Sequence, residues 1–187
     1  NLTGGTNDDT FTFTAGGSLT GAIDGAADAT DDRINIAAKV GANTIDLQLG
    51  TISGGFLGTF ANVEAFTGDN LADILVGTNA LTTWTINGVN DGTLSTNFSF
   101  IDIPNLTGGT GDDNFTLTGT GNITGTITGG GTGTDTVTGD NEVNAWSITG
   151  AGIGTLTDSA GANAFTGIEN LTGGTNDDTF TFTAGGS

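Results

Sequence analysis

The sequence is poor in cationic side chains and has no cysteine. Its 187 residues include two Lys or Arg residues against 21 Asp or Glu residues, which gives a formal net charge of −19 at pH 7. Binding of nucleic acid and docking onto anionic membranes both depend on Lys and Arg, so this composition argues against both. The lack of Cys rules out disulfide bridges. No segment approaches the ~20 apolar residues of a membrane-spanning helix, so we expect no membrane insertion.

Glycine and threonine are abundant instead. There are 35 Gly and 38 Thr residues but one Pro, and 34% of the residues are hydrophobic. So much glycine would suggest a fibrous or disordered chain, but disordered chains lack this supply of apolar side chains. A thin, repetitive fold accounts for both observations, because each repeat buries a few apolar residues and turns on glycine.

The chain carries an internal repeat. Residues 1–18 recur without a change as residues 170–187, so one full period covers positions 1–169, and a looser copy occupies residues 105–122. A short motif, F-x-x-[IV]-x-x-[LF]-T-G, relates positions 2, 66, 106 and 171. We therefore expect a single continuous segment, 1–187, that divides into units 2–65, 66–105 and 106–170 and restarts over 170–187.

The unit lengths predict the size of one turn of the chain. The long units 2–65 and 106–170 exceed the short unit 66–105 by nearly the same amount, as if one whole rung had been added to each. Two rungs in the short unit and three in each long unit predict eight rungs of about 21 residues, a length typical of β-solenoid coils. At ~4.8 Å per rung, eight rungs rise about 38 Å.

Local patterns predict strands and almost no helix. Apolar and polar residues alternate in several short segments, which is the period of a half-buried strand; these segments are 11–13, 34–36, 45–49, 84–86, 98–100, 115–117 and 180–182. Gly, Asn, Asp and Ser lie between them, as in turns. Because parallel crossovers are nearly always right-handed, we predict an all-β, right-handed parallel β-helix, or β-solenoid.

One turn motif carries candidate chemistry. Residues 108–116 and 130–138 both fit the nonapeptide G-G-x-G-x-D-x-U-x, where U is apolar, and their starting points are separated by the predicted length of one rung. Residues 4–12 and their copy 173–181 fit except for one Asn. A degraded version covers residues 27–34, and residues 68–75 hold a weaker one.

These nonapeptides resemble the calcium-binding RTX repeats, and the Thr/Gly-rich rungs resemble the very large repetitive surface proteins and adhesins of bacteria. In the RTX family, glycine carbonyls and the Asp side chain of this turn bind Ca²⁺ between neighbouring coils. The resemblance implies five metal ligands in this chain, with glycine carbonyls beside them: Asp9, Asp32, Asp113, Asp135 and Asp178.

Two interpretations of the motif stay open. Oxygen ligands suit Ca²⁺, but the ion needs six to eight of them. The RTX family repeats the nonapeptide in tandem, whereas here it occurs once per coil and not on every coil. The alternative is a turn in which the Asp side chains accept hydrogen bonds from their own backbone.

The sequence favours a structural role over catalysis. We expect a segment of a long extracellular or cell-surface fibre of tandem β-solenoid repeats, joined to itself head to tail and stabilised by calcium if the RTX interpretation holds. Neighbouring carboxylates such as Asp8 and Asp9 could suggest a glycosidase, but adjacent strand residues point to opposite faces, so we expect no enzyme. The alternative function is an adhesin or surface-binding stalk for glycans, an abiotic surface or ice, which aligned threonines would favour.

Overall fold

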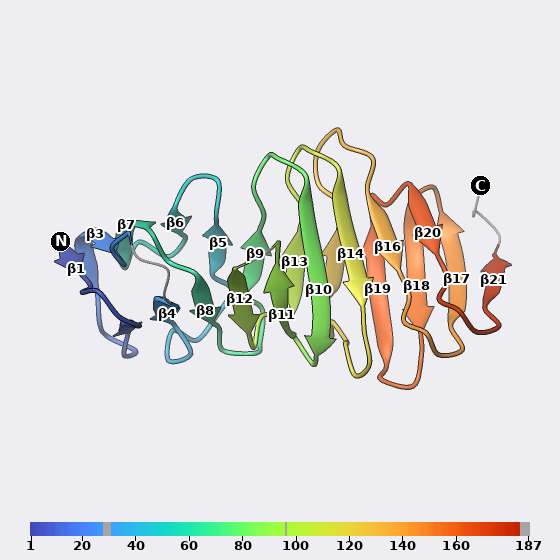
Figure 1. Cartoon of the computed structure of the whole chain (residues 1–187), viewed down its shortest axis with the longest axis horizontal. Helices are drawn as coiled ribbons and strands as arrows, with labels where there is room; N and C mark the ends of the chain where they lie inside the picture. Colours follow the sequence, from blue (N-terminus) through green and yellow to red (C-terminus); the bar gives the residue numbers. More distant parts are fainter. Residues whose placement is uncertain (28–30, 96, 184–187) are drawn as a thin grey trace.

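The computed structural model describes residues 1–27, 31–95 and 97–183, and within these ranges it is all-β without a helix (Figure 1). The end of the predicted restart, residues 184–187, and part of the degraded nonapeptide, residues 28–30, lie outside the described residues. In the described part of the chain there is accordingly no helix long and apolar enough to cross a membrane. The strands are β1 (Leu2–Thr3), β2 (Thr10–Thr12), β3 (Leu19–Asp24), β4 (Arg33–Asn35), β5 (Thr44–Asp46), β6 (Thr51–Ile52), β7 (Leu57–Ala61), β8 (Ala65–Thr67), β9 (Ile74–Val76), β10 (Thr82–Gly88), β11 (Asp91–Leu94), β12 (Phe98–Ile101), β13 (Asn105–Thr107), β14 (Asp113–Leu117), β15 (Thr126–Thr128), β16 (Thr136–Thr138), β17 (Ala145–Gly150), β18 (Ile153–Thr157), β19 (Ala162–Thr166), β20 (Asn170–Thr172) and β21 (Thr179–Phe182).

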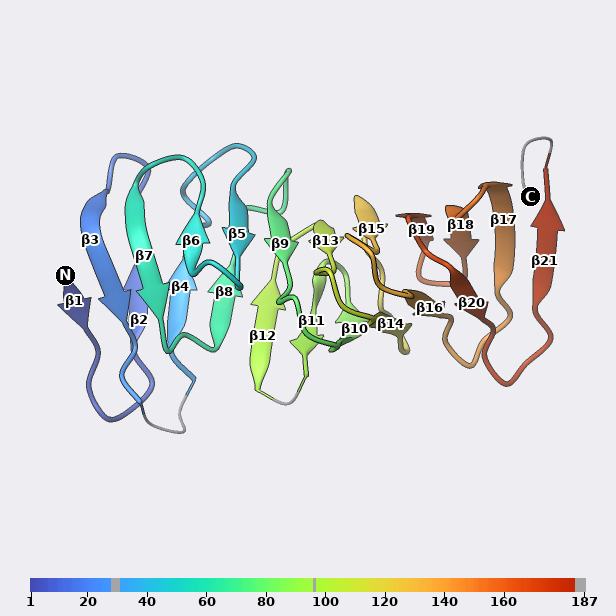
Figure 2. The same cartoon turned by 90° about the horizontal axis from the view of Figure 1, so that it is seen from above.

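The strands form three sheets that run along an elongated body, with the two chain ends at opposite ends (Figures 1 and 2). The first sheet has the order β1-β3-β7. The second has the order β2-β4-β8-β12-β11-β10-β14-β16-β20, and the third has the order β21-β17-β18-β19-β15-β13-β9-β5-β6. The first sheet continues the line of the third, because β7 lies against β6 and Phe60 N–H donates to Gly50 O at 2.8 Å. The molecule therefore has two long faces.

Most strands pair in parallel with a strand of the next coil, as predicted. The shortest coils match the predicted length, since Leu106 pairs with Ile127 and Phe115 pairs with Val137. Other coils are longer, as between Ile127 and its partner Phe165. The all-β class and the parallel stacking are thus confirmed, and a closed, right-handed solenoid remains a prediction. The coil length varies along the chain, so the predicted rung length describes the shortest coils.

The longer coils contain antiparallel strands that the sequence analysis did not anticipate. We call residues 82–101 the Trp84 meander and residues 145–166 the Trp146 meander. In each, three strands run antiparallel, and Trp84 faces Leu94 just as Trp146 faces Leu156. In the Trp84 meander, β10 pairs in parallel with β14 ahead and β12 pairs in parallel with β8 behind. The three strands of each meander therefore lie between a strand of an earlier coil and a strand of a later coil in the same sheet.

The meanders alternate between the two faces. An early one, residues 44–61, spans β5, β6 and β7 at the junction of the third and first sheets. The Trp84 meander lies in the second sheet and the Trp146 meander in the third. Successive repeat units therefore place their meanders on opposite sides of the body.

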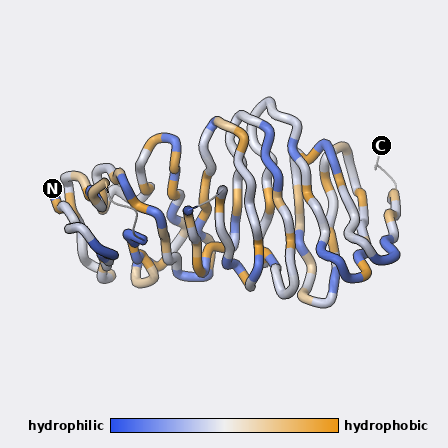
Figure 3. Tube along the Cα trace, in the orientation of Figure 1, coloured by the Kyte–Doolittle hydropathy of each residue, from blue (hydrophilic) through white to orange (hydrophobic). Residues whose placement is uncertain are grey.

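The buried apolar residues form one core cluster between the faces. Apolar and polar residues alternate along the trace (Figure 3). Aromatic side chains recur in the same arrangement in both tryptophan meanders. Trp84 stacks on Phe115 at 5.1 Å between ring centroids, and Trp146 stacks on Phe180 at 5.4 Å. Such pairs contribute about 0.5–1.5 kcal/mol each beyond the burial of their area.

Candidate functional site

The five predicted ligand residues occupy one recurring position in the fold. Each lies two residues before an apolar residue of the following strand, as Asp9 does before Phe11 in β2. Because side chains alternate between faces along a strand, both residues of such a pair point the same way. Asp32 and Asp113 are fully buried, and Asp135 is nearly so. The structure therefore places these aspartates at matching turns but spreads them over different coils.

The carboxylates close their own turns. Gly5 N–H donates to Asp9 Oδ2, and Gly109 N–H donates to Asp113 Oδ2 at 2.7 Å. The turn needs glycine, since a Cβ on Gly108 would lie 2.3 Å from Asp113 Oδ2. This geometry matches the alternative interpretation for these two turns, in which the Asp side chain accepts from its own backbone.

The same carboxylates also join neighbouring coils. In each case a backbone N–H of the earlier coil donates to a side-chain oxygen of the later coil; we call this series of bonds the carboxylate ladder. Its bonds run from Asp9 N to Asp32 Oδ1 (2.8 Å), from Asp32 N to Glu64 Oε2 (3.2 Å), from Asn43 N to Asp73 Oδ1 (3.0 Å), from Asp113 N to Asp135 Oδ1 (2.8 Å), from Asp135 N to Glu169 Oε2 (2.8 Å) and from Asn144 N to Asp178 Oδ1 (3.0 Å).

Two asparagines extend the ladder in an equivalent way. Asn43 Nδ2 donates to Asp73 Oδ1 at 2.9 Å, and Asn144 Nδ2 donates to Asp178 Oδ1 at 2.8 Å. Both amides also donate to two carbonyls of their own turn, at residues 39 and 41 and at residues 140 and 142. These bonds hold two buried polar side chains in place, since a buried amide without partners is costly.

Sequence reasoning missed four members of the ladder: Asn43, Glu64, Asn144 and Glu169. None of them lies in a nonapeptide, so the motif could not select them. A signal was nevertheless present, because each stands two residues before a buried or half-buried apolar residue, at positions 45, 66, 146 and 171. Asp73 was noted as part of a degraded nonapeptide but not as a candidate ligand.

Burial makes these carboxylates harder to ionise. Desolvation raises the pKa of Asp113 above its ordinary value of 3.8, and the hydrogen bond from Gly109 opposes this. Desolvation likewise raises the pKa of Asp135, and the nearby charge of Asp113 adds to the increase. The pKa of Asp73 is also raised by desolvation, against the hydrogen bonds from Asn43. The ladder therefore places negatively charged carboxylates on neighbouring coils, and hydrogen bonds from amide groups stabilise their ionised form.

The carboxylate oxygens of the ladder do not surround a common point where a cation could bind. The carboxylate oxygens accept from amides on successive coils instead of converging on one point. Within residues 1–27, 31–95 and 97–183 there is no group of three or more acidic side chains placed to hold a metal ion. In this structure the aspartates fit amide binding better than Ca²⁺, which requires six to eight oxygens, and calcium binding stays a prediction.

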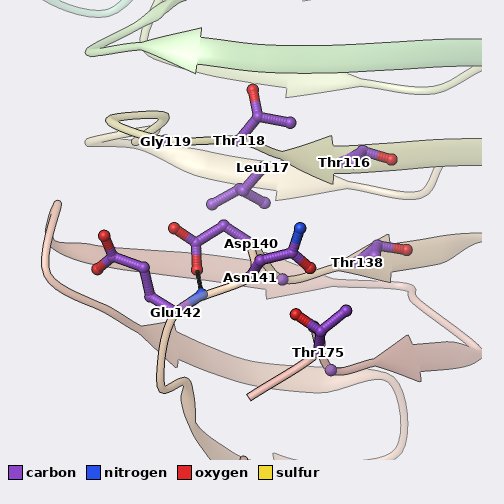
Figure 4. A pocket seen from close by; sticks show the side chains of 12 residues that line it. Thr116, Leu117, Thr118, Gly119, Thr138, Asp140, Asn141, Glu142 and Thr175 are labelled. Atoms are coloured by element: carbon purple, nitrogen blue, oxygen red, sulfur yellow. Dashed lines mark hydrogen bonds between the residues drawn. The ribbon is translucent and has the colours of Figure 1, made fainter.

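The molecule also has a groove of about 430 Å³ beside the ends of β14 and β16 (Figure 4). Thr116, Thr118 and Thr138 line one part of it, and the loop carrying Asp140 and Glu142 lines another. Asp140 Oδ1 accepts from Glu142 N–H at 2.9 Å, which fixes the loop. None of the described lining residues is cationic or aromatic, so the side chains of the groove offer hydroxyl, carboxylate and amide groups, with Leu117 as the apolar member.

Comparison of the chain with models of protein families, with curated proteins and with solved structures gave no match.

Proposed function

We propose that the chain is a structural segment of a long β-solenoid fibre. One observation carries the proposal: both long faces are hydrogen-bonded from one end of the body to the other, and the segment at one end has the same sequence as the segment at the other. A fold whose coils bond to one another, and whose ends repeat, is suited to unlimited extension along its axis.

The mechanism of such a segment is mechanical. Backbone hydrogen bonds join each coil to the next, and the carboxylate ladder adds bonds at the turns. The core cluster that contains Trp84, Phe115 and Phe66 holds the two faces together. We propose that right-handed coils repeat this arrangement along the fibre, and that copies join head to tail.

The charge of the chain fits a fibre that works in solution outside the cell or on its surface. A net charge of −19 keeps thin structures apart and soluble. On this basis we place the fibre in the extracellular space or on the cell surface. Detection of the protein at intact cells with an impermeant label checks this location.

Electron microscopy and fibre diffraction test the fibre proposal. We expect thin, unbranched filaments and a reflection along the fibre axis at about 4.7–4.9 Å, from strands stacked along that axis. Discrete globular particles at all protein concentrations would contradict the proposal.

The calcium hypothesis has its own test. Melting temperature and filament length are measured after dialysis against a chelator and after return of CaCl₂, with MgCl₂ as the control cation. Calcium-stabilised turns predict a loss that only Ca²⁺ restores. If all three samples behave alike, the turns are held by hydrogen bonds alone.

Aligned threonines favour a second function, binding of the fibre to a flat surface such as a glycan layer, an abiotic solid or ice. Thr116, Thr138 and Thr172 are register partners on β14, β16 and β20, so their side chains form a row across three strands. Replacement of Thr138 by Val keeps the shape and removes one hydroxyl. A surface-binding fibre should then adsorb more weakly, whereas a purely structural fibre should be unaffected.

A further inference from the structure

The segment of residues 1–18 occurs twice, and it is paired along one edge in its first copy and along the opposite edge in its second. In the first copy, β1 and β2 pair with β3 and β4 of the following coil, and Phe11 faces Ile34. In the second copy, β20 and β21 pair with β16 and β17 of the preceding coil, and Phe180 faces Trp146. Phe11 and Phe180 are the same position of the repeat, so one sequence forms paired strands on both of its edges.

The two sets of hydrogen bonds use different backbone groups. In the first copy, Phe13 N–H donates to the following coil at 2.9 Å, and Asp9 C=O accepts from it at 2.8 Å. In the second copy, Thr179 and Thr183 donate to the preceding coil at 2.9 and 3.0 Å, and they correspond to positions 10 and 14. Within the strand formed by β2 and β21, odd positions thus bond to the following coil and even positions to the preceding one, as expected for a strand between two parallel neighbours. A strand with both neighbours would therefore need no backbone group for two of these hydrogen bonds.

The turn carboxylate is compatible with both neighbours as well. Asp9 donates its backbone N–H to Asp32 of the following coil. Its equivalent, Asp178, accepts at Oδ1 from Asn144 of the preceding coil. One residue can make both bonds, because the first uses its amide and the second its side chain.

The same phenylalanine positions are buried in the first copy and exposed in the second. Phe13 is 7% exposed and packs edge-on against Phe56, with 5.1 Å between the ring centroids. Its equivalent, Phe182, is 67% exposed, and Phe180 is 42% exposed. In the described residues, β20 and β21 are the last strands of their sheets. A following segment like residues 19–56, which contains Phe56, would cover these phenylalanines.

We propose that residues 170–183 of one molecule replace residues 1–14 of a second copy of this chain, so that two molecules share one coil. The donated strands would bond to β16 and β17 of their own molecule and to β3 and β4 of the partner. The proposal rests on the fibre function and specifies how its copies join. It differs from simple stacking, in which the donated strands lie against β1 and β2 of the partner and nothing is displaced.

In the intact chain, the exchange replaces one set of contacts with an identical set. The strength of association therefore depends on how strongly residues 1–14 of the partner bind to β3 and β4 of their own molecule. Weakening the first copy should favour exchange, whereas weakening the second copy should prevent it. Simple stacking predicts that both changes reduce association.

Matched substitutions at the same repeat position make the first test. Phe13→Asp weakens the first copy and Phe182→Asp weakens the second, and sedimentation velocity over a range of concentrations measures the association of each full-length variant. We expect F13D to strengthen association at least about tenfold and F182D to weaken it at least about tenfold, since each tenfold step is about 1.4 kcal/mol. If both variants weaken association, or neither changes it, the exchange is wrong.

Cysteine cross-linking makes the second test, because the chain has no Cys of its own. Thr12 faces Asn35 in the first copy, so exchange brings Thr181 of one molecule beside Asn35 of the other. We expect T181C/N35C to give disulfide-linked multimers. T12C/N35C should link within one molecule and shows that the spacing permits the bond.

The control for stacking is T12C/T181C. Linked multimers from this variant, without any from T181C/N35C, would overturn the exchange in favour of stacking, and no intermolecular link from either variant would overturn it too. If filaments are still seen in micrographs when the cross-linking result contradicts the exchange, the fibre function is retained and only the exchange is wrong. Linked multimers of T181C/N35C that never grow beyond short particles would instead count against the fibre.

Discussion

At the scale of single residues, the turn aspartates matter because one residue bonds to two coils, within its own turn through its side chain and to the next coil through its backbone N–H. Asp113 accepts from Gly109 within its own turn, while its backbone N–H donates to Asp135 of the next coil. A carboxylate that accepts amide hydrogen bonds does at each turn what a cap does at a helix end. The cost is the desolvation of buried carboxylates, which raises the pKa of Asp113 and of Asp135, and neighbouring negative charges raise the pKa of Asp135 further.

Removing the acceptor of Asp113 should destabilise the fold, whereas removing only its charge should not. Asp113→Ala leaves Gly109 N–H without its partner, and we expect a loss of about 1–3 kcal/mol in the free energy of unfolding. Asp113→Asn keeps an oxygen acceptor and removes a buried charge, so its stability should stay within about 1 kcal/mol of the parent. Urea denaturation measures both. Equal losses would show that charge matters more than the hydrogen bond.

Mild acid should stabilise the molecule. The folded-state pKa values of Asp73, Asp113 and Asp135 are raised by burial, so the folded chain binds protons more tightly than the unfolded chain. The resulting stabilisation is fully present below the ordinary pKa of 3.8 and is lost as pH rises through the raised values. The pKa of exposed Asp24 is lowered by its bond from Asn62, and this acts in the opposite direction at low pH.

Melting temperature should therefore rise as pH is lowered from 7 towards the ordinary aspartate pKa of 3.8. A D113N/D135N variant should show a shallower rise, because two of the titrating groups are gone. A melting temperature that falls steadily over this range would contradict the assignment of buried, charged aspartates.

At the scale of elements, the backbones of neighbouring turns approach one another so closely that some glycines have no room for a Cβ atom. A Cβ on Gly109 would lie 1.8 Å from the carbonyl oxygen of Thr78 in a neighbouring coil. Gly109→Ala should therefore cost about 1–3 kcal/mol or prevent folding, as overpacking does. Gly16 has no atom within 4 Å of its Cβ position, so Gly16→Ala should change stability by less than about 0.5 kcal/mol. Thermal unfolding compares the two, and equal effects would argue against close turn stacking.

The sequence predicted the positions of strands and turns better than their connections. Alternation around Phe11, Trp84 and Phe115 marks strands whose apolar residues face the core, and the structure contains strands there. The antiparallel meanders could not be predicted, because the alternation of Trp84 and Leu94 is the same for parallel and antiparallel neighbours. Only the register, with Trp84 opposite Leu94, distinguishes them.

The candidate site was likewise predicted in position but not in partners. The nonapeptides locate Asp113 and Asp135 at neighbouring turns, as observed. They cannot show that Glu169 follows Asp135 or that Asn144 precedes Asp178, since that depends on which coils become neighbours after each meander. The choice between amide and calcium partners also depends on distances between coils.

At the scale of the whole molecule, uniform negative charge opposes both folding and assembly. With two cationic residues against 21 acidic ones, neighbouring coils repel one another, and salt screens this over about 8 Å at physiological strength. Raising NaCl from about 0.02 to 0.15 M should increase both melting temperature and filament length. Sucrose at matched osmolality serves as the control, and an equal response to it would point to surface exclusion instead of screening.

The alternation of the meanders has a geometric consequence for a tandem array. Each period holds an odd number of meanders, three, so the repeated segment lies on the first and second sheets at one end and on the second and third at the other. Eleven strand steps lead from β1 to β21 along the joined first and third sheets, but eight lead from β2 to β20 along the second. At ~4.8 Å per step, the two faces correspond to a rise of about 46 Å per period on average. In a tandem array the next period would exchange the faces, so the face with more strand steps would alternate from one side to the other and any bend of one period would be cancelled by the next.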